Sequence, residues 1–284
     1  LAMAATMAPP DAPASALTAI TEAAAGQPLM IRELALMTSS MDALGGLREL
    51  LAGRIRTLSA PQRRLLAAVA VAGYPLRRAL ALQIDGATAP DIDALIDARF
   101  VQELLGRGLE CVHAGVRETV LASLSADDRQ RLHRALLAGQ ETDTPEDAER
   151  AVVHLIGCGE GVRARAVALA AADNAQKALA FASVVRLCRL VLADASSEMP
   201  DEERRLVRLR VARALSGLGR AAEAAAEFVA GAEGAEPTEA AELRRQAAVH
   251  FLVSGHITRG RDLLRTALAD AGEVMPVGRN ASVW

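Results

Sequence analysis

The sequence predicts a mainly all-α protein in which one β-hairpin interrupts an otherwise helical chain. Hydrophobic residues make up 51% of the 284 residues, whereas aromatic residues make up only 2%. Much of the hydrophobic content is alanine, which has the highest helix propensity and takes little room, so closely packed helices are favoured over sheets. Helical periodicity, turn residues and capping residues divide the chain into five segments.

The first two segments precede the predicted domains. Residues 1–14 are rich in Ala and Pro and are expected to form a disordered tail. Residues 15–40 are predicted to form two helices separated by a turn at Gly26-Gln27-Pro28. Glycine and proline interrupt a helical pattern, and proline is tolerated in the first turn of the helix that follows.

Helices are expected at the start of the third segment. The first is predicted over 42–57, where leucines recur near helical spacing. Ser59 is a suitable N-cap for the second helix, which is expected to end at Gly73. Two more helices are predicted, one from Pro75 and one over about 90–99.

A β-hairpin is predicted to follow these helices. The run FVQELLGRGLECVH alternates apolar and polar residues on both sides of Gly106-Arg107-Gly108, which favours two strands and a glycine-rich turn. Helix resumes over 114–123. The last three predicted helices and the hairpin have the order of a winged helix, which is three helices followed by a two-stranded hairpin. We therefore assign residues 41–124 to a winged-helix domain.

The rest of the chain is predicted to be an α-solenoid over residues 125–275, followed by a tail at 276–284. Gly219 and Gly255 mark turns about 36 residues apart, close to the tetratricopeptide period of about 34 residues. The expected helices are capped by Ser125, opened by Pro145, or bounded by these glycines: 126–140, 146–157, an alanine-rich stretch over 161–194, 201–217, 220–232, 238–253 and 257–271. Residues 166–193 are expected to form an earlier and looser repeat.

Composition excludes several classes of function. The net charge is −3 and neither sign forms a long block, so a polyanion or an anionic membrane is not expected as the main partner. The three scattered cysteines fit a reducing cytoplasm, and no apolar run is long enough for a membrane span. Because the chain starts without Met and without a signal peptide, we expect a cytoplasmic fragment of a longer protein.

Two short motifs carry a resemblance to a known class of proteins. Gly26-Gln27-Pro28-Leu29 resembles the GxP motif of STAND signalling ATPases, and Val112-His113 resembles the Met-His-Asp motif of their winged helix. The stretch SGHITRGRDLLRTALADAGEVMP is similar to the helical region of bacterial proteins that join a Ser/Thr protein kinase to a STAND or AAA-type ATPase, a group that extends to large LuxR-type regulators. Kinase signatures are absent here, so a kinase would belong to a parent protein only.

The resemblance implies a nucleotide site that this chain completes only in part. Residues 15–40 would be the end of a helical lid, with Gly26 and Pro28 against the adenine ring of ATP or ADP. His113 would reach the β-phosphate of ADP and hold the inactive state, although Ala114 stands where the motif has Asp. No GxxxxGK[ST] run occurs, so an upstream ATPase domain would have to hold the phosphates. No cofactor is expected for this chain alone.

Other interpretations of these residues remain open. Pro28 could simply start a helix, and His113 could be a capping or partly buried structural residue. Cys111, His113, His154 and Cys158 have the chemistry of metal ligands, but their spacing fits no zinc pattern, so no metal site is expected. No GxSxG, HExxH or CxxC motif occurs, and no catalytic residues are assigned.

The leading hypothesis is therefore a non-catalytic regulatory or sensor fragment of a STAND-type ATPase. Its helical repeats would bind a protein partner or an inducer, and nucleotide state would control that binding. The alternative is a stand-alone helical-repeat adaptor without a nucleotide role. A winged-helix transcription factor is disfavoured because the third helix carries Asp91, Asp93 and Asp97, which would oppose DNA phosphates.

Overall fold

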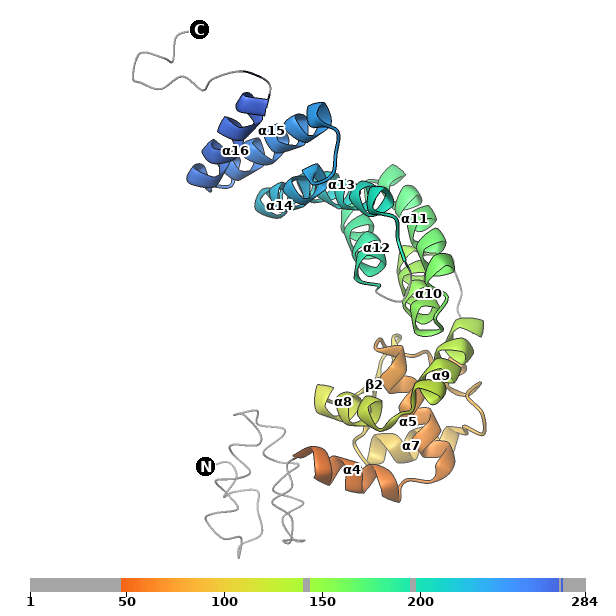
Figure 1. The fold of residues 1–284 in the computed structure, drawn as a ribbon. Helices are drawn as coiled ribbons and strands as arrows, with labels where there is room; N and C mark the ends of the chain where they lie inside the picture. The colour runs from red at the N-terminus through yellow and green to blue at the C-terminus, as the bar shows by residue number, and fades with distance from the viewer. Residues whose placement is uncertain (1–46, 140–143, 195–197, 271, 273–284) are drawn as a thin grey trace, which may run out of the picture. The chain divides into compact units, whose positions relative to one another are not determined.

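The computed structural model describes residues 47–139, 144–194, 198–270 and 272. These residues form thirteen helices and one two-stranded antiparallel sheet, so the all-α prediction is confirmed (Figure 1). The chain divides into two compact units, Leu1–Leu132 and His133–Trp284, here called the N-terminal unit and the repeat unit. None of the described helices is long and apolar enough to cross a membrane.

The N-terminal unit is built around a single buried helix, α5. Its elements are α4 (Leu47–Thr57), α5 (Ala60–Ala72), α6 (Arg78–Ala81), α7 (Ala89–Asp97), β1 (Val101–Leu104), β2 (Gly108–Cys111) and α8 (Ala114–Ser123). Ser59 caps α5 in a capping box with Gln62, and Gly73 ends the helix at a φ of 70°. The caps predicted from the sequence are both present. Every residue of α5 from Leu65 onward is buried, against α7, α8 and β2.

The hairpin is paired as predicted and has an extra contact that the sequence did not indicate. In the register, Val101 lies opposite Cys111, and Leu104 lies opposite Gly108. Leu76 forms an isolated bridge with Leu109 through two backbone hydrogen bonds of 2.7 and 2.8 Å. The helix predicted from Pro75 is therefore wrong in its start: the chain is extended at Leu76, and α6 begins at Arg78.

A glycine is required where the hairpin approaches this bridge. Gly108 has a φ of 117°, and a Cβ atom there would overlap the carbonyl group of Leu76. Glycine reaches this backbone conformation without steric penalty and leaves room for the close approach. The second glycine of the predicted turn is thus fixed by packing as well as by the turn.

Helix α9 (Ala126–Ala138) contains the point at which the two units divide. As predicted, Ser125 caps it: the Ser125 hydroxyl accepts a hydrogen bond from the Asp128 backbone N–H at 3.1 Å. The finer domain limits predicted at 41–124 and 125–275 are not decided by this division, and they stay predictions.

The repeat unit consists of antiparallel helices, each packed against the next along the chain (Figure 1). After α9 come α10 (Pro145–Gly157), α11 (Gly161–Lys177), α12 (Phe181–Ala193), α13 (Asp201–Gly217), α14 (Ala221–Ala232), α15 (Pro237–Val253) and α16 (Ile257–Asp270). Most of these bounds lie within a residue or two of the predicted ones. The main correction is that the alanine-rich stretch 161–194 is two helices with a turn at 178–180.

Three hairpins of the repeat unit share one design. In each, a first helix of 17 residues is joined by three residues to a second helix of 13, 12 or 14 residues. The central turn residue has a positive φ: 58° at Leu179, 72° at Gly219 and 82° at Gly255. The earlier repeat expected at 166–193 is therefore present as α11–α12, but it is as regular as the other two hairpins and not looser.

Small residues allow the helices of the repeat unit to pack closely. Ala172, Ala212 and Ala248 occupy matching positions in the first helices of the three hairpins, and each is fully buried. Gly260 of α16 also approaches α15 closely, because a Cβ atom there would lie 2.6 Å from the Leu252 side chain and 3.0 Å from the Ala248 carbonyl oxygen. Alanine content, noted in the sequence as a helix signal, thus also sets the distance between helices.

Candidate functional site

His113 is the only one of the three predicted nucleotide contacts within the described residues, since Gly26 and Pro28 lie outside them. It is the N-cap of α8, with extended backbone angles and a half-buried side chain. Its carbonyl accepts hydrogen bonds from the backbone N–H groups of Val116 and Arg117, but its side chain makes no capping hydrogen bond. The imidazole is therefore placed at a helix N-terminus without serving as its cap, which is compatible with binding an anion there.

Arg117 stands one helical turn after His113 on α8 and contacts α5. Its Nε donates a 2.9 Å hydrogen bond to the carbonyl oxygen of Ala70, in the last turn of α5. The guanidinium also lies beside Gly73, the residue that ends α5. A cation at a helix C-terminus interacts favourably with the helix dipole. Arg117 thus secures α8 to α5.

The four residues with metal-ligand chemistry do not come together in the part of the chain that the structure describes. No group of three or more His, Cys, Asp or Glu side chains there could hold a metal ion. Burial raises the pKa of Cys111 to about 11, so its thiol is protonated at neutral pH. His154 lies against His133 of α9, with 3.0 Å between the two Nδ1 atoms.

The pair His133 and His154 was missed by sequence reasoning, because its members are 21 residues apart on different helices. His154 is fully buried, and His133 is 8% exposed. Burial, with a smaller contribution from His133, lowers the pKa of His154 to about 4. A Cβ atom on Gly157 would overlap the His133 ring, so this glycine makes the room that the pair needs.

The acidic residues of α7 and β1 are partly neutralised by one arginine. Arg78 donates hydrogen bonds to Asp93 at 3.0 Å and to Glu103 at 2.9 Å. Asp91 instead accepts hydrogen bonds from the backbone and hydroxyl of Thr88 as part of the cap of α7. The carboxylates of this face are thus held by Arg78 or used to cap α7.

An open hollow of about 430 Å³ lies beside the hairpin turn, lined by Arg77, Arg78, Glu103, Leu104, Leu105, Gly106, Arg107 and Gly108. Its one carboxylate, Glu103, is paired with Arg78. A nucleophile with an adjacent base, the usual sign of covalent catalysis, is not among these lining residues. The hollow gives no support for a catalytic site.

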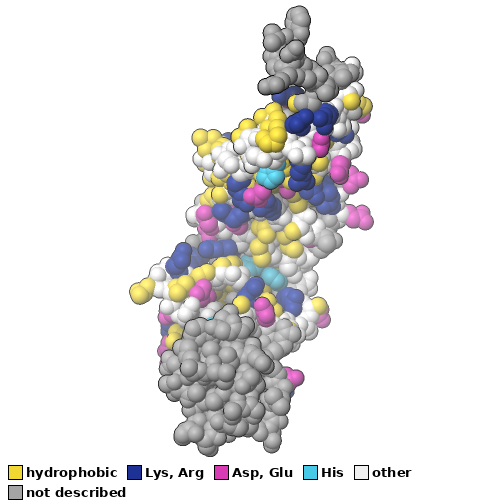
Figure 2. Space-filling model, turned by 90° about the vertical axis from the view of Figure 1, so that its left-hand side faces the viewer, with side chains coloured by type: hydrophobic (Ala, Val, Ile, Leu, Met, Phe, Trp, Pro, Cys, Tyr) yellow, Lys and Arg dark blue, Asp and Glu magenta, His cyan; other side chains and the backbone are white. Residues whose placement is uncertain are grey.

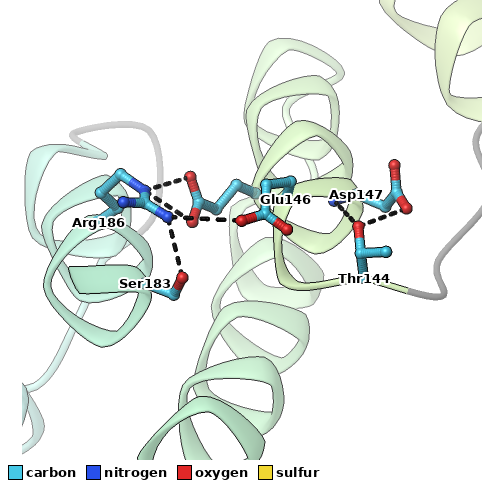
Figure 3. A network of polar contacts seen from close by, with 6 residues as sticks. Thr144, Glu146, Asp147, Ser183 and Arg186 are labelled. Atoms are coloured by element: carbon cyan, nitrogen blue, oxygen red, sulfur yellow. Dashed lines mark hydrogen bonds and ion pairs between the residues drawn. The ribbon is translucent and has the colours of Figure 1, made fainter. Parts of the chain in front are cut away.

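Ion pairs connect successive hairpins of the repeat unit. On one row of helices, Arg186 of α12 donates to Glu149 of α10 at 2.8 and 2.9 Å, as part of the network that includes Ser183 and Glu146 (Figure 3). Thr144 and Asp147 cap α10 next to this network (Figure 3). These contacts bring together helices that are not consecutive in the chain.

The same arrangement recurs one repeat later. Arg189 of α12 contacts Glu223 of α14 at 3.2 Å, and Arg205 of α13 contacts Glu239 of α15 at 2.9 Å. Each pair is separated by 34 residues, which is one tetratricopeptide period. The charged residues of the helix faces, which the sequence showed only as mixed charge, thus fix the register between repeats.

Several aliphatic side chains of the repeat unit remain exposed at the ends of its helices. Leu179 is 70% exposed, Val253 78% and Ile257 52%, and all three lie at or next to the turns within the hairpins. Figure 2 shows hydrophobic side chains at the surface between basic and acidic ones on the face that it displays. Sequence reasoning missed this feature. A usable signal was Leu179, which occupies the central turn position that glycine occupies in the other two hairpins, at Gly219 and Gly255.

Comparisons with known proteins give one structural likeness. No protein-family profile matches the sequence, and no curated protein matches it. Among solved structures, a STAND protein (signal transduction ATPase with numerous domains) with a tetratricopeptide repeat sensor from Pyrococcus horikoshii is similar, with a TM-score of 0.49 and 14% sequence identity. The similarity covers 89% of this chain but only 37% of that protein.

Proposed function

We propose that this chain is a non-catalytic regulatory part of a STAND-type signalling ATPase, in which the helical repeats receive a protein partner or inducer. The observation that carries the proposal is the repeat unit itself. Its helices bury alanine-rich faces against one another, while aliphatic side chains stay exposed at the hairpin turns. Such a scaffold presents side chains for recognition and has no chemistry of its own.

Nucleotide coupling is the finer part of the proposal, and it rests on the motifs in the sequence. Gly26 and Pro28 would contact the adenine of ATP or ADP in the parent protein. His113 would reach a phosphate from the N-terminus of α8, where backbone N–H groups and the helix dipole favour an anion. The order α5, α6, α7, β1 and β2 before α8, which is three helices followed by a hairpin, supports a winged-helix domain in this role. The parent would act in the cytoplasm, and a linked kinase is compatible with the resemblance of the C-terminal stretch.

The test uses the parent protein with its upstream ATPase domain. We expect it to bind ADP, and we expect His113→Ala to weaken ADP binding and raise basal signalling. Glu118→Ala is a matched control, because Glu118 is exposed on the same helix. If His113→Ala binds ADP as the unaltered parent does and signalling stays off, the phosphate role of His113 is wrong.

The second candidate function is a helical-repeat adaptor that never contacts nucleotide. It is favoured by the separate compactness of the repeat unit, which does not need the N-terminal unit to form its core. Sequencing the gene upstream of Leu1 separates the two. A strand, a Walker A loop and a helix there support the ATPase, whereas their absence supports the adaptor.

A further inference from the structure

The three turns of the repeat hairpins lie on one edge of the repeat unit, here called the turn edge (residues 178–180, 218–220 and 254–256). They share an edge because each hairpin is antiparallel and the next hairpin runs in the same direction. Contacts between neighbouring turns confirm this. A Cβ atom on Gly217 would lie 2.8 Å from the ring of Phe181, and the Ser216 hydroxyl lies 3.0 Å from Nε2 of His250.

The turn edge carries exposed aliphatic side chains from all three hairpins. Leu179, Leu218, Val253 and Ile257 are exposed there by 70%, 39%, 78% and 52%. They come from all three hairpins, so the apolar surface extends along the edge. They stand at different positions of their hairpins, but exposed aliphatic side chains from three successive hairpins on one edge mark a candidate interaction surface.

Leu179 is the clearest case, because its backbone is also unfavourable. It has a φ of 58° at the position where Gly219 and Gly255 have 72° and 82°. The surrounding hydrogen bonds are the same in all three turns: the N–H of the central residue donates to the carbonyl three residues earlier at 3.0 or 3.1 Å. Glycine satisfies this turn without strain, whereas leucine does not. Leu179 is both strained and exposed, so it does not contribute to stability, and such backbone outliers point to function.

Charge is segregated between this edge and the opposite one. Within 174–183, 214–223 and 250–259 the charged residues are Lys177, Arg220, Arg259 and Glu223. Glu223 is already bound to Arg189 and Arg220. The loops of the opposite edge and the first turns of the helices that follow them are acidic, although Arg205 pairs with Glu202 and Glu239 and Arg165 pairs with Glu203. Their acidic residues are Asp194, Glu198, Asp201, Glu202, Glu203, Glu233, Glu236 and Glu239. The turn edge is therefore apolar and basic.

We propose that the turn edge binds an acidic amphipathic segment of a partner protein. Leu179, Val253 and Ile257 contact the aliphatic side chains of this segment, and Lys177 and Arg259 attract its carboxylates. The complementary charge selects an acidic partner and disfavours a basic one. This inference rests on the proposed function, because it specifies where the repeats receive a partner and what chemistry that partner has.

The probe is a fluorescein-labelled helical peptide with leucine on one face and glutamate on the other, and fluorescence anisotropy measures its binding to the full chain. One comparison peptide replaces glutamate by lysine, and another replaces leucine by serine. We expect only the leucine–glutamate peptide to bind, with affinity that falls as salt is raised. Leu179→Gly and Lys177→Gln should each weaken binding severalfold, up to about tenfold. Leu179→Gly removes the side chain and relieves the backbone, so loss of folding does not explain the result.

Val162→Ser is the matched control, because Val162 is 68% exposed at the start of α11, on the opposite edge. It should leave binding unchanged. Lys177 is the single lysine of the chain, so an amine-reactive reagent followed by mass spectrometry reports directly on the turn edge. The peptide should protect Lys177 from acylation.

Three results would overturn the proposal. The lysine peptide could bind as well as the glutamate peptide, Leu179→Gly could leave affinity unchanged, or sedimentation could show that copies of the chain associate through this edge and exclude the peptide. The last result would identify a second copy as the occupant. ADP binding by the parent does not involve the turn edge, so failure here and failure of the nucleotide proposal give different results.

Discussion

The backbone conformation at the central turn position of each repeat hairpin should make the repeat unit more stable with glycine there than with alanine. The perturbation is a pair of substitutions at Leu179, to Gly and to Ala, together with Gly219→Ala. The two positions are equivalent, with φ values of 58° and 72°. At Gly219 a Cβ atom would have nothing within 4 Å, so Gly219→Ala changes the backbone preference and no packing.

The magnitude follows from two opposing effects. An L-residue in the left-handed region costs about 1–2 kcal/mol, which glycine avoids. Glycine also makes the unfolded chain more flexible than alanine does, and this entropy offsets about 0.4–1 kcal/mol of the stability that glycine gains in the turn. We therefore expect Leu179→Gly to be more stable than Leu179→Ala by about 0.5–1 kcal/mol. Gly219→Ala should destabilise the repeat unit by the same amount, because the same two effects act in the opposite direction.

Urea unfolding followed by circular dichroism measures these differences, with the transition of the repeat unit analysed separately from that of the N-terminal unit. Leu179→Ala is the reference at position 179 because it removes most of the side chain and keeps the strain. Equal stability of Leu179→Gly and Leu179→Ala, or a stabilising Gly219→Ala, would refute the argument that the turn imposes a left-handed conformation.

Three other predictions follow from single contacts. The free energy of unfolding should fall by up to about 3 kcal/mol as pH is lowered from 6.5 to about 4. The reason is that the pKa of His154 is lowered to about 4 in the folded protein, so the imidazole gains a proton on unfolding. In urea titrations at several pH values His154→Phe should reduce this pH dependence, and an unchanged pH dependence would contradict the prediction. Gly108→Ala should destabilise the N-terminal unit by at least about 2 kcal/mol, because its Cβ would overlap the Leu76 carbonyl; a normal Tm would show that the bridge is absent in solution. Arg205→Ala, which removes ion pairs to two glutamates, should lower stability by about 1 kcal/mol and more at low salt than at high salt; salt-independent loss would mean that packing of its side chain dominates.

Local signals explain most of what the sequence predicted correctly. The cap at Ser59, the helix end at Gly73 and the turns at Gly219 and Gly255 all depend on residues within a few positions of the feature that they specify. Glycine marks a left-handed turn because other residues avoid it. The break at 178–180 was missed for the same reason, since Leu179 adopts that conformation without being glycine.

The features that the sequence did not reveal depend on contacts between distant segments. The extended backbone at Leu76 is set by two hydrogen bonds to Leu109, whereas the local sequence from Pro75 onward predicted a helix. His133 and His154 meet only because α9 and α10 pack together around Gly157. Arg117 contacts the carbonyl of Ala70, 47 residues away, which no local pattern indicates. The nucleotide contacts at Gly26 and Pro28 stay predictions, because they lie outside the described residues.

The way in which the repeats are held together bears on how a partner could affect them. Alanines fill many of the buried positions between the helices, including Ala168, Ala172 and Ala212. Small side chains bury little area, and exposed ion pairs such as Arg189 with Glu223 contribute only about 0–1 kcal/mol each. Each interface between hairpins is then stabilised by small contributions from burial and ion pairs. The stability of such a stack is close to the sum of the stabilities of its repeats and of the interfaces between neighbouring repeats. A segment that binds along the turn edge touches all three hairpins at once, so we expect it to stabilise their stacking together, a change that hydrogen exchange across α12 to α15 would detect.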